Sequence, residues 1–327
     1  MICELEHKIF TSEDTEFEEL ALGLFQFQYS QNAVYREYVQ LLAINSHNVT
    51  SLDTIPFLPI GLFKSHRVST SSREEAVYES SGTTQVIPAR HFVSDLSIYY
   101  KSFTTTFEDF YGPASEWCIL GLLPSYLERK NSSLVAMVNR LIQQSGHPDS
   151  GFYLHDHAAL STVIQRLERT GQKTILIGVT FALLDFAEKF SMPLQHTIVM
   201  ETGGMKGRRE EMTRDEVHEI LKTAWSLDEI HSEYGMTELL SQAYSKGEGV
   251  FISPPWMKIF LREEDDPLRV KHRGRGLINV VDLANIYSCP FIATDDVGLV
   301  HSNGSFEVLG RTDNSDLRGC SLMTEYL

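Results

Sequence analysis

Thr174-Ile-Leu-Ile-Gly-Val-Thr180 is a short apolar run with the composition of a buried β-strand. A segment with helical spacing of its apolar residues follows at 181–190, and a second apolar run, Thr197-Ile-Val-Met200, comes after it. Short apolar strands separated by helices are typical of a mainly parallel sheet that is covered by helices on both faces. This stretch therefore predicts an α/β fold.

The same alternation continues in both directions along the chain. A strand is expected at 117–123, and helices are expected at 132–144 and 158–169. Further on, Thr213-Arg-Asp-Glu216 has the pattern of a capping box, which opens a helix. The residues expected on the inward face of that helix are Val217, Ile220, Leu221, Ala224 and Trp225.

The two ends of the chain have different patterns. Residues 1–50 show the spacing of amphipathic helices, whereas little helix is expected after 245. We therefore divide the chain into a helical segment (1–75), an α/β core (76–245) and a β-rich subdomain (246–327). The strands expected in the β-rich subdomain lie at 250–261, 276–283, 290–293, 299–300 and 306–309.

Composition excludes several classes of partner. The formal charge of −16 over 327 residues argues against a nucleic-acid backbone or an anionic membrane surface, because both attract Lys and Arg. No run of about 18 apolar residues is present, so no membrane span is expected. The N-terminus is acidic where a signal peptide would be basic and then apolar, which predicts a cytoplasmic protein.

The four cysteines are far apart, so neither a zinc site nor a disulfide framework is expected. Cys118 and Cys289 lie in apolar runs and are expected to be buried hydrophobes. Cys320 differs, because it lies in Leu317-Arg-Gly-Cys-Ser321, beside a guanidinium that favours the nucleophilic thiolate.

The stretch His231-Ser-Glu-Tyr-Gly-Met-Thr-Glu238 follows an apolar segment and carries several chemical groups in a short space. The Tyr234 ring can stack on a purine, and the Thr237 hydroxyl can bond a phosphoryl oxygen. The Glu238 carboxylate can hold Mg²⁺, which enters proteins through one or two carboxylates plus phosphate oxygens. The alternative is an ordinary strand-to-helix turn with a carboxylate in the first helical turn. Ligands of parallel sheets bind outside the carboxyl ends of the strands, and this favours a site.

A second polar stretch, Glu79-Ser-Ser-Gly-Thr-Thr-Gln85, follows a short expected strand. Its hydroxyls and backbone N–H groups suit a loop that wraps phosphate. It lacks the Gly-Lys-Ser/Thr ending of a P-loop, and a solvated turn of the same composition is the alternative. Lys64, after the apolar run Ile55-Pro-Phe-Leu-Pro-Ile-Gly-Leu-Phe63, is expected to be a snorkelling side chain and not a ligand.

Four elements occur in a fixed order: Ser-Ser-Gly-Thr-Thr, Tyr-Gly-Met-Thr-Glu, Thr-Asp-Asp and Gly-Arg-Thr-Asp. Together they resemble the core motifs of the adenylate-forming superfamily. The turn Glu201-Thr-Gly-Gly-Met-Lys-Gly207, the 57–64 run and the ending Arg318-Gly-Cys-Ser-Leu-Met323 resemble more specifically the LuxE-type acyl-protein synthetases of bacterial luminescence. This second resemblance covers residues 55–323 and implies one integrated adenylation unit.

The resemblance implies a role for each matching residue. ATP phosphates would be held by Ser80, Ser81, Gly82, Thr83 and Thr84. The adenine would lie near Gly203, Gly204, Tyr234 and Gly235, and the ribose near Asp296 and Arg311. Thr237 would contact the α-phosphate, Glu238 would bind Mg²⁺, and Cys320 would carry the acyl group as a thioester.

Two departures from the superfamily pattern bear on this assignment. Gln85 replaces the usual glycine after the Ser/Thr stretch, which weakens the expected phosphate grip. The chain also ends soon after Gly310-Arg311, before the small C-terminal domain that usually brings a catalytic lysine; LuxE-type synthetases are short in the same way. Lys206 is a candidate for the missing cation, against the alternative of a surface lysine near a turn.

The expected activity is ATP-dependent activation of a fatty or other hydrophobic carboxylic acid as its acyl-adenylate, followed by transfer to Cys320. The partner would then be an acyl-accepting protein such as a reductase, and a homo-oligomer is compatible with the sequence. Two alternatives stay open. In one, the thiol acceptor is coenzyme A or a carrier protein; in the other, the chain binds nucleotide or a partner without catalysis.

Overall fold

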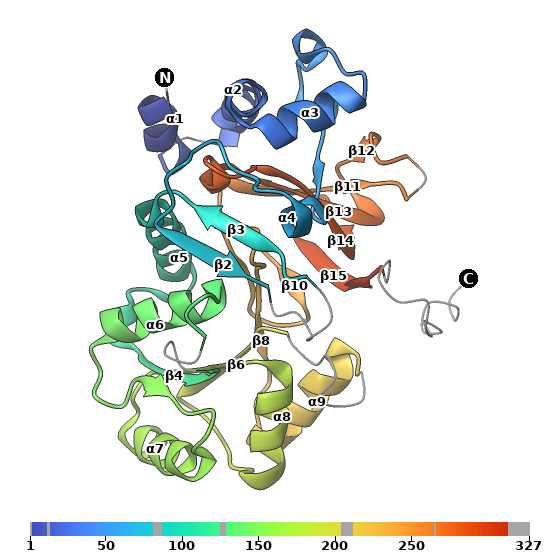
Figure 1. Ribbon diagram of the computed structural model, residues 1–327. Coiled ribbons are helices and arrows are strands. Elements are labelled where there is room, and N and C mark those ends of the chain that lie inside the picture. The colour runs from blue at the N-terminus through green and yellow to red at the C-terminus, as the bar shows by residue number, and fades with distance from the viewer. Residues whose placement is uncertain are drawn as a thin grey trace.

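The computed structural model describes residues 2–11, 14–80, 87–124, 129–203, 212–264 and 266–312. Two large sheets and a small hairpin form its framework. In Figure 1 the N-terminal helices lie at one end of the molecule, the antiparallel sheet lies in the middle, and the parallel sheet with its helices lies at the other end.

The parallel sheet confirms the expected α/β fold. Its strand order is β5-β4-β6-β7-β8-β9, with β9 alone antiparallel to its neighbour. Every residue of β4 and β6 is buried, as the continuous apolar runs predict for strands covered on both faces. The strands are β4 (Cys118–Leu122), β5 (Gly151–Phe152), β6 (Thr174–Gly178), β7 (Thr197–Glu201), β8 (His231–Tyr234) and β9 (Ala243–Ser245).

Helices cover both faces of this sheet because alternate strand residues point to opposite sides. Ile175 packs in one core with residues of α5 (Leu96–Tyr111) and α6 (Ser133–Ser145). Its neighbour Leu176 packs in a second core with residues of the other three helices. Those helices are α7 (His157–Thr170), α8 (Thr180–Lys189) and α9 (Arg214–Trp225).

Helix α9 begins as predicted, because Thr213 and Glu216 form both bonds of the capping box. One prediction for its inward face is wrong: Ile220 is 41% exposed. The helix buries a narrower stripe of Val217, Leu221 and Trp225 against α8, so the position of Ile220 falls outside that stripe.

The second sheet has the order β10-β15-β14-β13-β11-β12 and is antiparallel throughout that path. The short strand β1 (Leu58–Pro59) pairs parallel to β14. Two boundary predictions are wrong: 250–261 is split before Met257 by two prolines, and 290–293 and 299–300 belong to one long strand. The strands are β10 (Val250–Phe251), β11 (Met257–Arg262), β12 (Val270–Lys271), β13 (Gly274–Asp282), β14 (Phe291–Val300) and β15 (Phe306–Arg311).

The N-terminal helices pack onto the second sheet by way of buried polar contacts. Gln28 donates from Nε2 to the Ile286 carbonyl at 2.7 Å, and Asn32 donates from Nδ2 to the Ser288 carbonyl at 2.9 Å. These helices are α1 (Ile2–Ile9), α2 (Phe17–Gln31) and α3 (Ala33–Leu41). The division at 75 and 245 stays a prediction, although β1 from the first segment joins the sheet of the third.

A short helix, a β-hairpin and a 3₁₀ helix complete the fold, and Figure 1 shows the hairpin between the two sheets. Helix α4 (Leu62–Ser65) follows β1, and β2 (Ala76–Glu79) pairs antiparallel with β3 (Arg90–Val93). The 3₁₀ helix η5 (Leu283–Asn285) follows β13. Among the residues that the structure describes, no helix has the length and apolar character needed to cross a membrane.

Candidate active site

The described candidate residues gather where the carboxyl ends of β7 and β8 approach the bend of β14. Tyr234 is the last residue of β8, Gly203 follows β7, and Asp296 lies within β14. The remaining candidates, Ser81, Gly82, Thr83, Thr84, Gly204, Lys206 and Cys320, lie outside the described residues. Their assigned roles stay predictions.

Tyr234 and Asp296 form the central contact of the site. The phenol of Tyr234 donates to Asp296 Oδ2 at 2.9 Å. The ring packs against Phe251 and Phe306, with centroid distances of 5.9 and 5.3 Å. Burial, followed by the charge of Asp296, holds the pKa of Tyr234 well above its usual range, so the phenol stays a hydrogen-bond donor.

Arg311 completes this contact from the neighbouring strand. The register of β14 and β15 pairs Asp296 with Arg311, and Arg311 Nε lies 3.6 Å from Asp296 Oδ1. Asp296 therefore has one oxygen facing a phenol and the other facing a guanidinium. The negative charge of its neighbour Asp295 interacts instead with the buried guanidinium of Arg262. The two adjacent carboxylates therefore have different partners, as expected for successive strand residues, whose side chains point to opposite faces.

The Thr237–Glu238 segment is a turn, and β9 is the next regular element after it, so the strand-to-helix alternative is wrong. Three side chains hold this turn by its backbone. His91 Nδ1 lies 2.7 Å from the Thr237 carbonyl, and Asn285 Nδ2 donates to the Glu238 carbonyl at 2.7 Å. Asp282 Oδ2 accepts from the backbone N–H groups of Leu240 and Ser241, just after the turn, at 2.8 and 3.0 Å.

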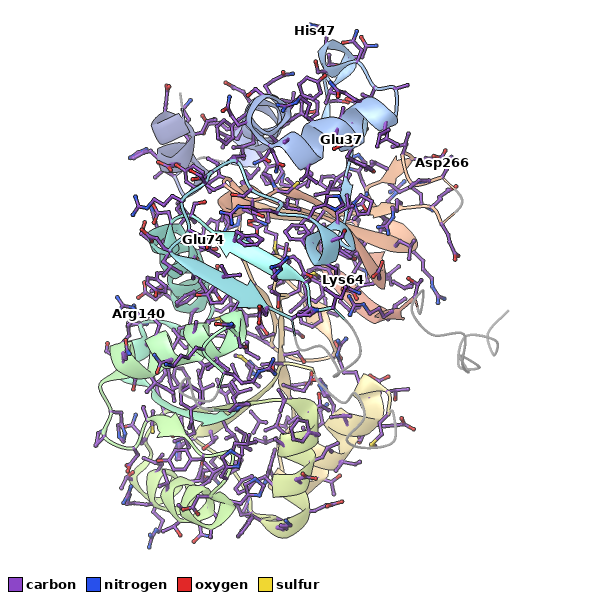
Figure 2. The ribbon with its side chains drawn as sticks, in the orientation of Figure 1. Glu37, His47, Lys64, Glu74, Arg140 and Asp266 are labelled. Carbon is purple, nitrogen blue, oxygen red and sulfur yellow. The ribbon has the colours of Figure 1, made fainter. Side chains whose placement is uncertain are left out.

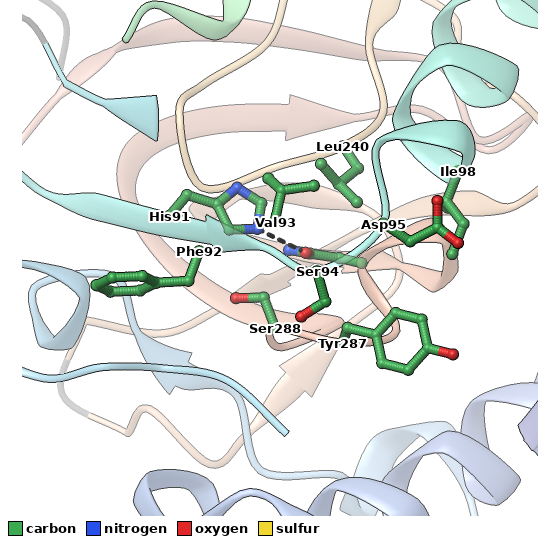
Figure 3. Close-up of a pocket in the computed structure, with 10 residues that line it drawn as sticks. His91, Phe92, Val93, Ser94, Asp95, Ile98, Leu240, Tyr287 and Ser288 are labelled. Atoms are coloured by element: carbon green, nitrogen blue, oxygen red, sulfur yellow. Dashed lines mark hydrogen bonds between the residues drawn. The ribbon is translucent and has the colours of Figure 1, made fainter. Parts of the chain in front are cut away.

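His91 is the residue that joins these supports to one another. Its Nε2 atom lies 3.0 Å from Asn285 Oδ1, and the dashed line in Figure 3 marks this bond. A small cavity beside the ring is lined by Ser94, Ile98 and Leu240 among others, and Ser94 Oγ has no hydrogen-bond partner among the residues that the structure describes. Burial lowers the pKa of His91 to about 4, so the ring is neutral at pH 7.

Glu238 is 7% exposed, so its carboxyl group is largely removed from water. Burial raises its pKa to about 7. Asp296 raises it further, whereas the positive charges of Arg311 and Lys64 lower it. A nearby Mg²⁺ would favour the ionised form, so the residues present fit a metal held by one carboxylate and nucleotide phosphates. Within the described ranges there is no cluster of three or more His, Cys, Asp or Glu side chains that could hold a metal without such phosphates.

The glycine turn after β7 is held by Glu201. Gly203 has a φ of +76°, a conformation that side chains rarely adopt, and its N–H donates to Glu201 Oε1 at 2.6 Å. The Thr180 hydroxyl donates to the same oxygen at 2.5 Å. These two hydrogen bonds fix the backbone at Gly203, where the chain leaves the sheet beside the end of β8.

Gly235 packs closely against the carboxyl of Glu233, which the sequence analysis did not single out. A Cβ at Gly235 would lie 2.4 Å from Glu233 Oε1. Burial, and then the charge of Glu201, raise the pKa of Glu233 to about 8. Ser80 lies at the base of its loop, where its hydroxyl accepts from the Ala89 N–H at 2.9 Å.

Sequence reasoning missed His91, Asp282 and Asn285, which support the turn from other elements. His91 follows Arg90 a few residues after the polar 79–85 stretch, and nothing in its spacing indicates burial. The two cysteines described with side chains are free and buried as expected; burial raises the pKa of Cys118 to about 11 and that of Cys289 to about 12.

These features define the fold of the adenylate-forming ligases. ATP-bound MatB from Rhodopseudomonas palustris superposes with a TM-score of 0.54 and 18% identity, over 72% of this chain and 48% of MatB. The chain thus spans about half the length of that protein. A 2-hydroxyisobutyryl-CoA ligase in complex with 2-HIB-AMP and CoA superposes with a TM-score of 0.66 and 12% identity, over 94% of this chain and 72% of the ligase.

Sequence comparison then identifies the family. The chain belongs to the acyl-protein synthetase (LuxE) family, which it matches over residues 9–326. It is 24% identical to the long-chain-fatty-acid–luciferin-component ligase of Vibrio harveyi, over 93% of this chain and 85% of that protein. It is 23% identical to the ligase of the same name from Aliivibrio fischeri, over 93% and 86%. The predicted family and the predicted enzyme class, a ligase, are confirmed.

Proposed function

We propose that this chain uses ATP to activate a fatty or other hydrophobic carboxylic acid as its acyl-adenylate and then transfers the acyl group to Cys320. The observation that carries the proposal is the convergence of Tyr234, Asp296 and Glu238 at one edge of the parallel sheet. A phenol–carboxylate pair suits ribose and purine, and a poised carboxyl suits Mg²⁺.

Each candidate then has a role in the proposed reaction. Asp296 and Arg311 bind the ribose side, and Tyr234 flanks the adenine together with Gly203, Gly204 and Gly235. Thr237 contacts the α-phosphate and Glu238 binds Mg²⁺. The phosphate contacts come from the remaining candidates, Ser80, Ser81, Gly82, Thr83, Thr84 and Lys206.

The chemistry has two steps. In the first, an oxygen of the carboxylic acid attacks the α-phosphorus of ATP, the bond from that phosphorus to its bridging oxygen breaks, and pyrophosphate leaves with the electron pair. In the second, a thiolate attacks the acyl carbon of the mixed anhydride and AMP leaves. The protein contributes positioning and charge neutralisation.

The identity of the acceptor thiol separates the main proposal from its rival. The 2-hydroxyisobutyryl-CoA ligase that shares this fold is seen with CoA, which favours an external thiol as the second candidate. The two luminescence ligases are named for a luciferin component, which favours a fatty acid and a partner protein such as a reductase. The cytoplasmic location and a homo-oligomeric state stay predictions.

Acyl labelling tests the proposal. The protein is incubated with MgATP and radiolabelled fatty acids of several lengths, separated under denaturing conditions and treated with neutral hydroxylamine. ATP-dependent, hydroxylamine-labile label should appear in the wild type and in Cys118→Ala, and should be absent in Cys320→Ser. Label that persists in Cys320→Ser overturns the role of Cys320.

A further inference from the structure

Lys64 follows a strand, β1, that pairs parallel with the otherwise antiparallel second sheet. Strand β1 runs parallel to β14, with Pro59 opposite Ala293, and the Ile60 N–H donates to the Ala293 carbonyl at 2.9 Å. Because the two strands run in the same direction, the residues after Pro59 and those after Ala293 continue toward the same end of the strand pair. Lys64, which follows β1, and Asp296, which lies further along β14, are therefore found toward that same end.

The short helix that carries Lys64 is fixed to the support of the Thr237–Glu238 turn. Phe63 is fully buried, and its ring meets the His91 ring edge-on, with centroids 6.0 Å apart. His91 in turn contacts the Thr237 carbonyl. The position of Lys64 is thus tied through two packed side chains to the turn that presents Glu238.

The Lys64 ammonium is exposed, and it has no hydrogen bond or ion pair with the part of the chain that the structure describes. Figure 2 shows Lys64 in the middle of the molecule, between the two sheets. Its positive charge acts on the Glu238 carboxyl. The other cation that acts there, Arg311, is paired with Asp296. The exposed ammonium is compatible with the snorkelling side chain expected from the sequence, and its charge also acts on Glu238.

We propose that Lys64 binds the β- and γ-phosphates of the nucleotide and neutralises the pyrophosphate as it leaves. This inference rests on the proposed function. The helix of Lys64 packs on β3, whose His91 contacts the Thr237–Glu238 turn, and nucleotide phosphates that share a Mg²⁺ with Glu238 would lie within reach of the charge of Lys64. When the bond from the α-phosphorus to the bridging oxygen breaks, the electron pair stays on pyrophosphate, and Lys64 stabilises that charge without giving up its proton.

Nucleotide binding tests the proposal without requiring turnover. Titration calorimetry of Lys64→Met, with Mg²⁺ and no carboxylic acid, should show about tenfold or greater weakening for ATP and for pyrophosphate, and no change for AMP. Lys64→Arg should retain most of the affinity for ATP. The matched control is Lys189→Met, at the exposed end of α8, which should behave as the wild type.

The outcomes separate this inference from the proposed function. Equal weakening of ATP and AMP, or no weakening of either, overturns the role of Lys64. Wild-type protein that binds ATP but shows no acid-dependent ATP–pyrophosphate exchange overturns the proposed function and leaves the phosphate contact standing. Exchange in the wild type together with unchanged ATP affinity in Lys64→Met overturns the role of Lys64 alone.

Discussion

The phenol of Tyr234 lies 2.9 Å from Oδ2 of Asp296, and this hydrogen bond joins the two large sheets of the protein. Tyr234 ends β8 of the parallel sheet, whereas Asp296 lies in β14 of the antiparallel sheet. The candidate site therefore forms at the junction of the sheets, and its geometry depends on how they are packed together.

Tyr234→Phe should lower the free energy of unfolding by about 1.5–3 kcal/mol, because a hydrogen bond to a charged group is lost while the ring packing is kept. Urea denaturation measures this change. Tyr38→Phe is the matched control, since its hydroxyl donates to a neutral carbonyl, that of Phe57, and should cost about 0.5–1.5 kcal/mol. A smaller loss for Tyr234→Phe than for Tyr38→Phe would contradict the assigned contact.

His91→Leu should lower the free energy of unfolding by about 2 kcal/mol or more, because the single N–H of the neutral ring is lost and one of the two buried oxygens that it faces, the Thr237 carbonyl or the Asn285 amide oxygen, is left without its donor. The same variant should bind ATP more weakly, since the turn that presents Glu238 loses a support. Thermal unfolding and calorimetry measure the two effects. Exposed His66 supplies the control variant, His66→Leu, and a stability loss as large in that control would argue against the role of His91.

The free energy of unfolding should fall as the pH rises from 7 to 8 and should level off above 8. The pKa of Glu233 is raised from 4.5 to about 8 in the folded protein, so the unfolded state releases this proton first, and the stability is lost between these two pKa values. The slope is at most about 1.4 kcal/mol per pH unit for one group, and less here because Glu233 keeps some exposure.

The matching variant is Glu233→Gln, which should have a flatter profile in urea denaturation over the same pH range. His91 does not contribute there, because its pKa is lowered to about 4 and the ring is neutral in the folded and unfolded states above pH 7. An equally steep profile in Glu233→Gln would show that the carboxyl is ionised in the folded protein.

Gly178→Ala should lower the free energy of unfolding by about 1–3 kcal/mol through overpacking. A Cβ there would lie 2.9 Å from both Leu122 Cβ and Leu183 Cγ, where β6 meets β4 and α8. Gly61→Ala is the control, because nothing lies within 4 Å of its added methyl and its φ of −58° suits alanine. Thermal unfolding that ranks the two variants the other way would contradict the packing of this edge.

The parallel sheet could be predicted from the sequence because its signals are local. Continuous apolar runs such as 174–180 mark strands that are buried on both faces, and the Thr213–Glu216 capping box marks the start of a helix within four residues. The order of the four motifs indicated the adenylate-forming superfamily, and the stretches at 57–64, 201–207 and 318–323 indicated the LuxE-type family, because such motifs match in sequence and need no distances.

The supports of the site could not be predicted, because they depend on pairings between distant segments. His91 and Asn285 are 194 residues apart, and the role of His91 follows only from the packing of β3 between the sheets. Lys64 follows an apolar run that predicts a snorkelling side chain, and its charge acts on Glu238 in a fold where β1 pairs with the distant β14. The long β14 was divided because its charged Asp295 and Asp296 interrupt the apolar pattern where the strand bends.

The most direct test of the account is ATP–pyrophosphate exchange with a panel of carboxylic acids. We expect labelled pyrophosphate to be transferred into ATP only when an acid is present, and we expect this exchange to persist in Cys320→Ser. It should fall by at least about 100-fold in Glu238→Gln, because the charge proposed to hold Mg²⁺ is removed. Absence of exchange with every acid, in a folded protein that binds ATP, would contradict acyl-adenylate formation by this chain.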